Sequence, residues 1–231
     1  MRLENVLSVA RSISQCGELK LVNLWDLCKE TAGLPGVVVE VGVYKGGSAF
    51  VLANATYKPV YLCDTFAGTP EAPLHEGDEH RAGDWRSSVA AVRELFPEDD
   101  ERITLCVGEY IETFPKLGLP VAFAHIDVDL YHWTRLVLAD IWGRLVEGGI
   151  VVCDDYGAQT CEGAKAAVDE FLAEVSDCAA SPGVETQIVL RKVPPAPVRR
   201  PKTQKDEPAA LAAEPLPEVA IEDETERLHA D

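Results

Sequence analysis

Two short apolar runs, each followed by acidic residues, constrain the fold of this chain more than any other feature. Residues 122–126 form the first run and residues 150–153 the second, with a helix-like pattern over 133–145 between them. Short, continuous apolar runs are typical of strands buried in a parallel sheet. The segment therefore predicts a strand–helix–strand unit with acids at both strand ends. These acids are Asp127, Asp129, Asp154 and Asp155.

The carboxyl ends of neighbouring parallel strands meet at one edge of a sheet, where open α/β proteins bind their ligands. Three or four carboxylates converging at that edge repel one another unless a cation neutralises them. Hard oxygen ligands suit Mg2+, Ca2+ or Mn2+ better than zinc. The spacing alone leaves open whether Asp127 or Asp129 faces the cation, because side chains two apart on a strand share a face.

A glycine-rich turn follows the first predicted strand, at residues 37–42. Gly42 ends this strand, and a helix is predicted from Ser48 to about residue 55. Glycines at such a turn let a ligand approach the backbone, and the helix N-terminus offers free N–H groups. Glu40 lies among valines inside the strand, so its carboxylate needs a polar partner, for which a ligand amine or hydroxyl would serve.

A second predicted strand, at residues 60–64, ends in Asp64. A carboxylate some 20 residues beyond a glycine-rich turn suits the hydroxyls of a ribose. The competing interpretation is that Asp64 caps a turn. The long polar segment 65–84 that follows predicts a lid. Its histidines, His75 and His80, are interpreted as residues of a solvated loop.

The whole pattern predicts an α/β fold of the Rossmann-like kind. Its sheet is expected to be mostly parallel, with an antiparallel edge strand at 187–191 and helices on both faces. We expect three regions: a helical cap at 1–35, the α/β domain at 36–192, and a disordered tail rich in proline and alanine at 193–231.

Composition excludes several classes of partner. The net charge of −18 argues against nucleic acid and against an anionic membrane surface. No apolar run approaches the roughly 18 residues of a membrane span, and the N-terminus does not resemble a signal peptide. The seven cysteines contain no C-x-x-C pair and predict reduced thiols in a cytoplasmic protein.

Several segments, taken in order, resemble those of class I S-adenosylmethionine-dependent methyltransferases. The closer similarity is to the TylF-like macrocin O-methyltransferase family, which methylates sugar hydroxyls in antibiotic biosynthesis. The resemblance covers about residues 36–175. The segments that carry it are 40–48, 64–70, 80–84, 126–131, 154–156 and 161–171.

The resemblance implies a role for each site residue, with S-adenosylmethionine and Mg2+, or Mn2+, as cofactors. Asp129 would be the general base, and the metal ligands would be Asp127, Asp154 and Asp155. The cofactor-binding residues would be Glu40, Gly42, Ser48, Asp64, Ser88, Gly108, Glu109 and Asp127. The acceptor would be a small-molecule hydroxyl, on a sugar of a glycosylated secondary metabolite. Independently of the resemblance, a homodimer through the N-terminal helices is a hypothesis.

Three alternatives stay open. A catechol-type methyltransferase shares the fold, the cofactor and the metal and differs in its aromatic diol acceptor. A non-catalytic α/β ligand-binding protein would not need the intact carboxylate cluster. An NAD-binding oxidoreductase is disfavoured because Tyr44 stands where the G-x-G-x-x-G pattern requires glycine, and because Glu40 would repel a pyrophosphate.

Overall fold

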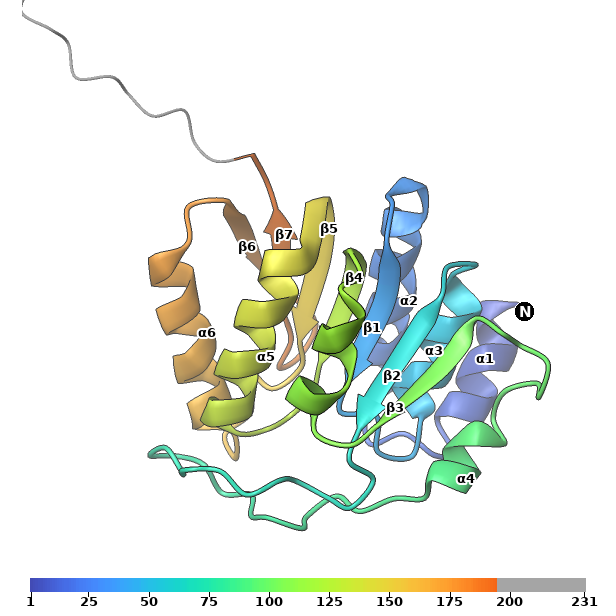
Figure 1. The fold of residues 1–231 in the computed structure, drawn as a ribbon, viewed down its shortest axis with the longest axis horizontal. Helices are drawn as coiled ribbons and strands as arrows, with labels where there is room; N and C mark the ends of the chain where they lie inside the picture. The colour runs from blue at the N-terminus through green and yellow to red at the C-terminus, as the bar shows by residue number, and fades with distance from the viewer. Residues whose placement is uncertain (195–231) are drawn as a thin grey trace, which may run out of the picture. The chain divides into compact units, whose positions relative to one another are not determined.

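The computed structural model describes residues 1–194, so the predicted tail lies outside the described residues from position 195 onward. A single seven-stranded sheet, in the order β3-β2-β1-β4-β5-β7-β6, forms the centre of this part of the chain (Figure 1). The strands are β1 (Val37–Val41), β2 (Val60–Asp64), β3 (Ile103–Val107), β4 (Val121–Ile126), β5 (Leu145–Cys153), β6 (Cys178–Pro182) and β7 (Ile188–Lys192).

Strands β1 to β5 pair in parallel, and the direction of winding reverses between β1 and β4. Val41 pairs with Cys63 on one side and with Ile126 on the other, and Ile126 pairs with Cys153. The residues that follow these four positions therefore stand side by side at the carboxyl edge of the sheet, at the point where α/β folds bind ligands. They are Gly42, Asp64, Asp127 and Asp154.

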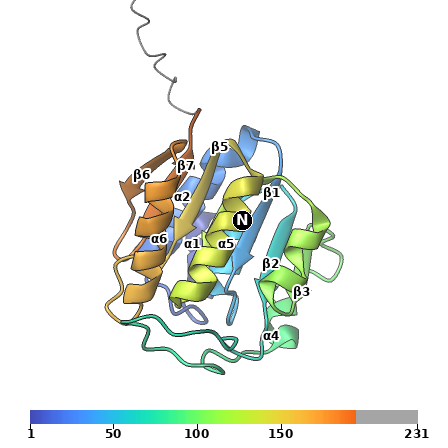
Figure 2. The ribbon, with the colours of Figure 1, turned by 60° about the vertical axis from the view of Figure 1, so that its left-hand side comes forward.

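Helices cover both faces of the sheet (Figures 1 and 2). Side chains that alternate along each strand supply two separate cores, with Val38 in the first and its neighbour Val39 in the second. The first core joins the sheet to α1 (Leu3–Ala10), α2 (Glu18–Glu30) and α3 (Gly47–Ala55). The second joins it to α5 (Tyr131–Arg144) and α6 (Glu162–Glu174).

The predicted fold class is confirmed, with differences at its margins. The antiparallel strand β7 is not the edge, because β6 pairs with it on the outside. Strand β6 escaped prediction because its sequence, CAASP, has no β-branched residue, and an edge position tolerates its proline. The sequence of residues 85–96 has the amphipathic pattern of a helix, but only the short α4 (Val89–Arg93) forms, because Trp85 has a positive φ of 60° and Ser88 caps the helix start.

The segment between β2 and α4 contains no helix or regular strand within the described chain. It runs below the carboxyl ends of the strands, out toward α6 and back to α4 (Figure 1, teal). All seven cysteines lie in the described part and are unpaired, and Cys63, Cys106 and Cys153 are buried as expected. Among residues 1–194, no helix has the length and apolarity that crossing a membrane requires.

Candidate active site

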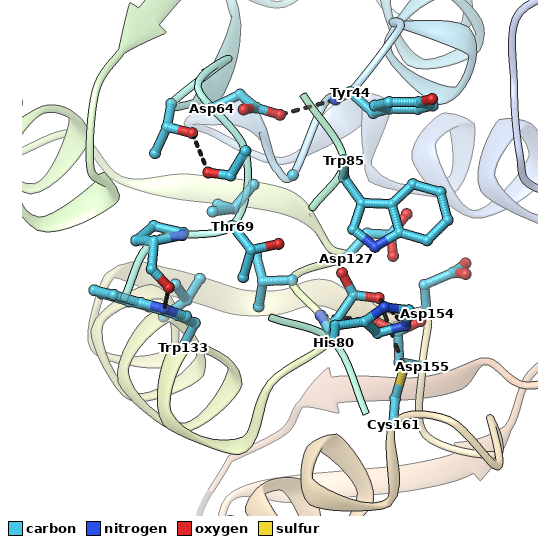
Figure 3. Close-up of a pocket in the computed structure, with 18 of the residues that line it drawn as sticks. Tyr44, Asp64, Thr69, His80, Trp85, Asp127, Trp133, Asp154, Asp155 and Cys161 are labelled. Atoms are coloured by element: carbon cyan, nitrogen blue, oxygen red, sulfur yellow. Dashed lines mark hydrogen bonds and ion pairs between the residues drawn. The ribbon is translucent and has the colours of Figure 1, made fainter. Parts of the chain in front are cut away.

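A cavity of about 500 Å³ opens at the carboxyl edge of the sheet, over β1, β2, β4 and β5 (Figure 3). Several further parts of the chain close it: the segment 65–85, Tyr110, Trp133 and Val137 of α5, residues 158–161 before α6, and the N-terminal residues Gln15, Cys16 and Lys20. Its volume is in the range of small-molecule sites. Helix α2 and the connection between α1 and α2 therefore contribute to the site directly.

The glycine-rich turn forms one wall of the cavity. Gly42 has a φ of +88°, and a Cβ at this position would lie 1.8 Å from the carbonyl oxygen of Asp127, so only glycine fits. One carboxylate oxygen of Asp64 accepts the backbone N–H groups of Val43 and Tyr44, both at 2.8 Å, and the other accepts that of Phe66 at 2.6 Å. Asp64 thus holds the turn and also lines the cavity.

Three carboxylates, those of Asp127, Asp129 and Asp155, lie so close that one oxygen from each is within 4.8 Å of the other two. Burial, followed by repulsion from Asp155, raises the pKa of Asp129 to about 7. Burial, followed by repulsion from Asp154, raises the pKa of Asp155 to about 6. Burial, followed by repulsion from Asp155, also raises the pKa of Asp127. This uncompensated negative charge on hard oxygen ligands fits a divalent cation such as Mg2+.

Asp154 differs from these three because the protein itself compensates its charge. It forms an ion pair with Lys20 of α2 at 2.5 Å and accepts the side-chain amide of Gln187 at 2.8 Å. Burial acts to raise the pKa of Asp154, but its contacts with His125 and Lys20 outweigh burial and lower it. The site therefore divides into one carboxylate paired with a lysine and three that have no lysine or arginine partner within residues 1–194; these three are called unsatisfied below.

Glu40 has a different partner from the one expected. Its Oε1 lies 2.9 Å from Nδ1 of the fully buried His125, whose Nε2 lies 3.4 Å from Asp154. Burial opposes protonation of this imidazole, but its contacts with Asp154 and Glu40 outweigh burial and raise the pKa of His125 to about 10. The partner of Glu40 is thus a protein side chain, although its Oε2 has none within residues 1–194.

Neither His125 nor Lys20 was among the predicted site residues. His125 lies in an apolar run, and the only sequence feature that could have marked it as a site residue is its position two residues before Asp127. Lys20 lies on a distant helix, and only the tertiary packing brings it to Asp154.

Of the remaining predicted cofactor residues, Gly108 lines the cavity. The other three do not belong to its lining as residues 1–194 define it. Ser48 is buried in the first turn of α3. Glu109 is exposed, and exposed Ser88 accepts the N–H of Ala91 as the N-cap of α4. Their roles in cofactor binding therefore stay predictions, and the structure shows a capping role for Ser88.

The interpretation of His80 as a residue of a solvated loop is wrong. His80 lines the cavity, with Nε2 at 3.5 Å from Oδ1 of Asp129, and its ring meets Trp85 edge-on (Figure 3). Cys161 completes this corner, with Sγ at 3.6 Å from the same oxygen of Asp129. Burial, followed by repulsion from Asp155, raises the pKa of Cys161, so this thiol is not an activated nucleophile.

The raised pKa values of Asp129 and Asp155 predict how stability depends on pH without a divalent cation. Both pKa values exceed the ordinary value of about 3.9. The folded chain therefore holds protons that the unfolded chain releases, and the unfolding free energy should fall by about 2 kcal/mol or more between pH 4 and 7. Urea unfolding in EDTA across this range measures the fall. Millimolar Mg2+ should reduce it, and a rise in stability instead would contradict the prediction.

Comparison with solved structures places this arrangement in the methyltransferase class. The structure of the O-methyltransferase NovP superimposes with a TM-score of 0.69 at 26% identity, covering 79% of this chain and 83% of NovP. The seven-stranded, mostly parallel sheet with helices on both faces is therefore a Rossmann-like methyltransferase fold.

Sequence comparison then gives the family. The model of the macrocin-O-methyltransferase (TylF) family matches residues 9–177. Demethyldecarbamoylnovobiocin O-methyltransferase of Streptomyces niveus is 28% identical, over 71% of this chain and 70% of that protein. A tetracenomycin 4'-O-methyltransferase of Streptomyces olivaceus is 31% identical, over 63% of this chain and 64% of that protein. The chain belongs to the TylF family of O-methyltransferases, which confirms the resemblance.

Proposed function

We propose that the protein transfers a methyl group from S-adenosylmethionine to a sugar hydroxyl of a glycosylated secondary metabolite, with Mg2+ or Mn2+ bound at the acidic cluster. The observation that carries this proposal is the meeting, in one cavity, of a glycine-rich turn and the unsatisfied carboxylates of Asp127, Asp129 and Asp155. The relative whose name specifies 4'-O-methylation of a tetracenomycin that carries a rhamnosyl group supports the acceptor class.

The cofactor would lie along the wall that runs from β1 to β3. Gly42 and Gly108 leave the backbone open to the ligand, and Asp64 borders the same wall. The carboxylate of Asp64 accepts three backbone N–H groups of the turn and the following residues. A carboxylate has about four lone-pair sites, so one site remains that could accept a ribose hydroxyl. Glu40 would act behind the turn by holding His125.

The carboxylates would divide the remaining work. Asp127 and Asp155 would hold the cation together with Asp154, which would have to turn from Lys20 or share its oxygens with it. A cation bound there would supply Lewis-acid assistance to deprotonation of the acceptor hydroxyl. Asp129, with its pKa raised to about 7, would accept the proton of that hydroxyl as general base. The lid and the N-terminal segment would orient the acceptor and exclude water.

The catechol alternative differs only in the acceptor, and specific tests separate it. The cavity lining includes Trp85 and Trp133, whose rings suit stacking with either a sugar or an aromatic diol. Methyl transfer to demethyldecarbamoylnovobiocin, compared with transfer to 3,4-dihydroxybenzoate, distinguishes the two classes. Faster turnover of the second acceptor would replace the sugar proposal by the catechol one.

Titration calorimetry tests the cofactor before any acceptor is known. S-adenosylhomocysteine should bind with a micromolar dissociation constant both in Mg2+ and in EDTA, because no residue of the glycine-rich turn belongs to the acidic cluster. NAD+, as the control ligand, should not bind. If neither ligand binds, the result favours the non-catalytic alternative. If NAD+ binds and S-adenosylhomocysteine does not, the result favours an oxidoreductase.

A further inference from the structure

We propose that His80 of the lid is a positioning residue for Asp129, so that docking of the lid completes the general base. This inference rests on the proposed methyl transfer and adds to it a residue outside the acidic cluster. The two histidines of the lid, His75 and His80, lie in different surroundings. His80 lines the cavity, whereas His75 stacks on Tyr131, with ring centroids 4.5 Å apart, and does not contribute to the described cavity wall.

Asp78 fixes the lid two residues before His80. Its side chain is buried, with one oxygen accepting the N–H of Tyr131 at the start of α5, at 3.2 Å, and the other accepting the N–H of His75 at 2.8 Å. A carboxylate is favourable at a helix N-terminus. The backbone of Asp78 also forms an isolated antiparallel β-bridge with Cys161, the residue before α6. The lid is therefore attached at the starts of both α5 and α6.

Gly163 in the first turn of α6 makes room for this attachment. A Cβ at this position would lie 2.0 Å from Oδ1 of Asp78 and would displace the carboxylate. A second backbone contact follows directly, because Glu79 donates its N–H to the carbonyl of Thr160 at 3.2 Å. The chain is therefore held at the two residues that directly precede His80, and this attachment places His80 at the cavity.

His80 reaches Asp129 through one defined nitrogen. Its Nε2 lies 3.5 Å from Oδ1 of Asp129, while its Nδ1 lies 3.9 Å from Oδ2 of Asp84. The distance to Asp129 is longer than a typical hydrogen bond, as is common for catalytic contacts before the substrate binds. The two groups come from separate parts of the chain, and the side chain of Asp129 is only 18% exposed.

Asp129 has two other contacts, one at its backbone and one from the Cys161 thiol to the carboxylate oxygen that His80 approaches. Its backbone, at a positive φ of 59°, is held by an N–H donated to Asp155 at 3.1 Å. A general base must direct one carboxylate oxygen at the acceptor hydroxyl. A contact of His80 and Cys161 with Oδ1 leaves Oδ2 for that purpose.

The test compares three substitutions of His80 in methyl transfer to demethyldecarbamoylnovobiocin. The amide nitrogen of glutamine mimics Nε2 of histidine, and that of asparagine mimics Nδ1. His80→Ala and His80→Asn should therefore lower kcat by about 10–100-fold, whereas His80→Gln should recover most of it. Binding of S-adenosylhomocysteine should not change in any variant. The matched control is His75→Gln on the same lid, which should keep the wild-type kcat.

Combination with Asp129→Asn provides a second measurement. Groups that act as a unit give strongly non-additive losses, so the double variant with His80→Ala should be no slower than Asp129→Asn alone. Equal losses in His80→Gln and His80→Ala, or additive losses in the double variant, would overturn the proposal. Failure of the proposed function would show in the wild type itself, as absence of both S-adenosylhomocysteine binding and methyl transfer, and would remove the inference with it.

Discussion

Replacing Asp155 with alanine is expected to lower Mg2+-dependent methyl transfer by at least about 100-fold, with little change in the affinity for S-adenosylhomocysteine. Asp155 belongs to the three unsatisfied carboxylates and is not part of the glycine-rich turn. Its removal should therefore abolish the cation site without disturbing the cofactor site. Calorimetry with Mg2+ and with S-adenosylhomocysteine, each in a separate titration, measures the two effects.

Two further variants make this result specific. Asp155→Asn keeps an oxygen that can accept the N–H of Asp129, so it separates the charge of Asp155 from this hydrogen bond. We expect it to lose Mg2+ binding as Asp155→Ala does. Asp99→Ala, which removes an exposed carboxylate far along the chain from the cluster, is the control and should behave as the wild type. Equal loss of metal and cofactor binding in Asp155→Ala would count against the metal assignment.

The second large effect concerns the backbone contact between β1 and β4. Gly42→Ala should destabilise the protein by about 3 kcal/mol or more, because a Cβ would lie 1.8 Å from the carbonyl oxygen of Asp127 and φ is +88°. The strain acts on the glycine-rich turn and on the acidic cluster together. We therefore expect loss of both S-adenosylhomocysteine and Mg2+ binding, in contrast to Asp155→Ala. Urea unfolding measures the change in stability.

Gly143→Ala is the matched control for this substitution. Gly143 lies in helix α5, is exposed, has no neighbouring atom within 4 Å of an added Cβ, and is not among the glycines with a positive φ. The same chemical change should here stabilise the protein by about 0.5–1 kcal/mol, because alanine is the better helix former. Destabilisation by both substitutions to a similar degree would contradict the steric explanation for Gly42.

The conformational requirements of the lid explain where local prediction failed. The pattern over 85–96 has helical spacing, but Trp85 adopts φ = 60° where the lid turns toward α4, and only residues 89–93 are helical. Similarly, residue type and loop position do not distinguish His80 from His75, and only the family-like segment 80–84 includes the first and not the second. The buried attachment of Asp78 to the start of α5 places one of them in the cavity and the other on the surface of α5.

The sequence by itself determined the α/β sheet, the order of its parallel strands along the chain and the acids at their carboxyl ends, because β-branched runs, glycine punctuation and helical periodicity are local properties. Family membership follows from the same segments. Only the tertiary structure decided the partners of those acids. Glu40 meets His125, Asp154 meets Lys20, and Asp129 meets His80, since each contact joins residues far apart in the sequence. The packing of α2 and the lid against the sheet brings these side chains together, and no local pattern encodes a pairing across such distances.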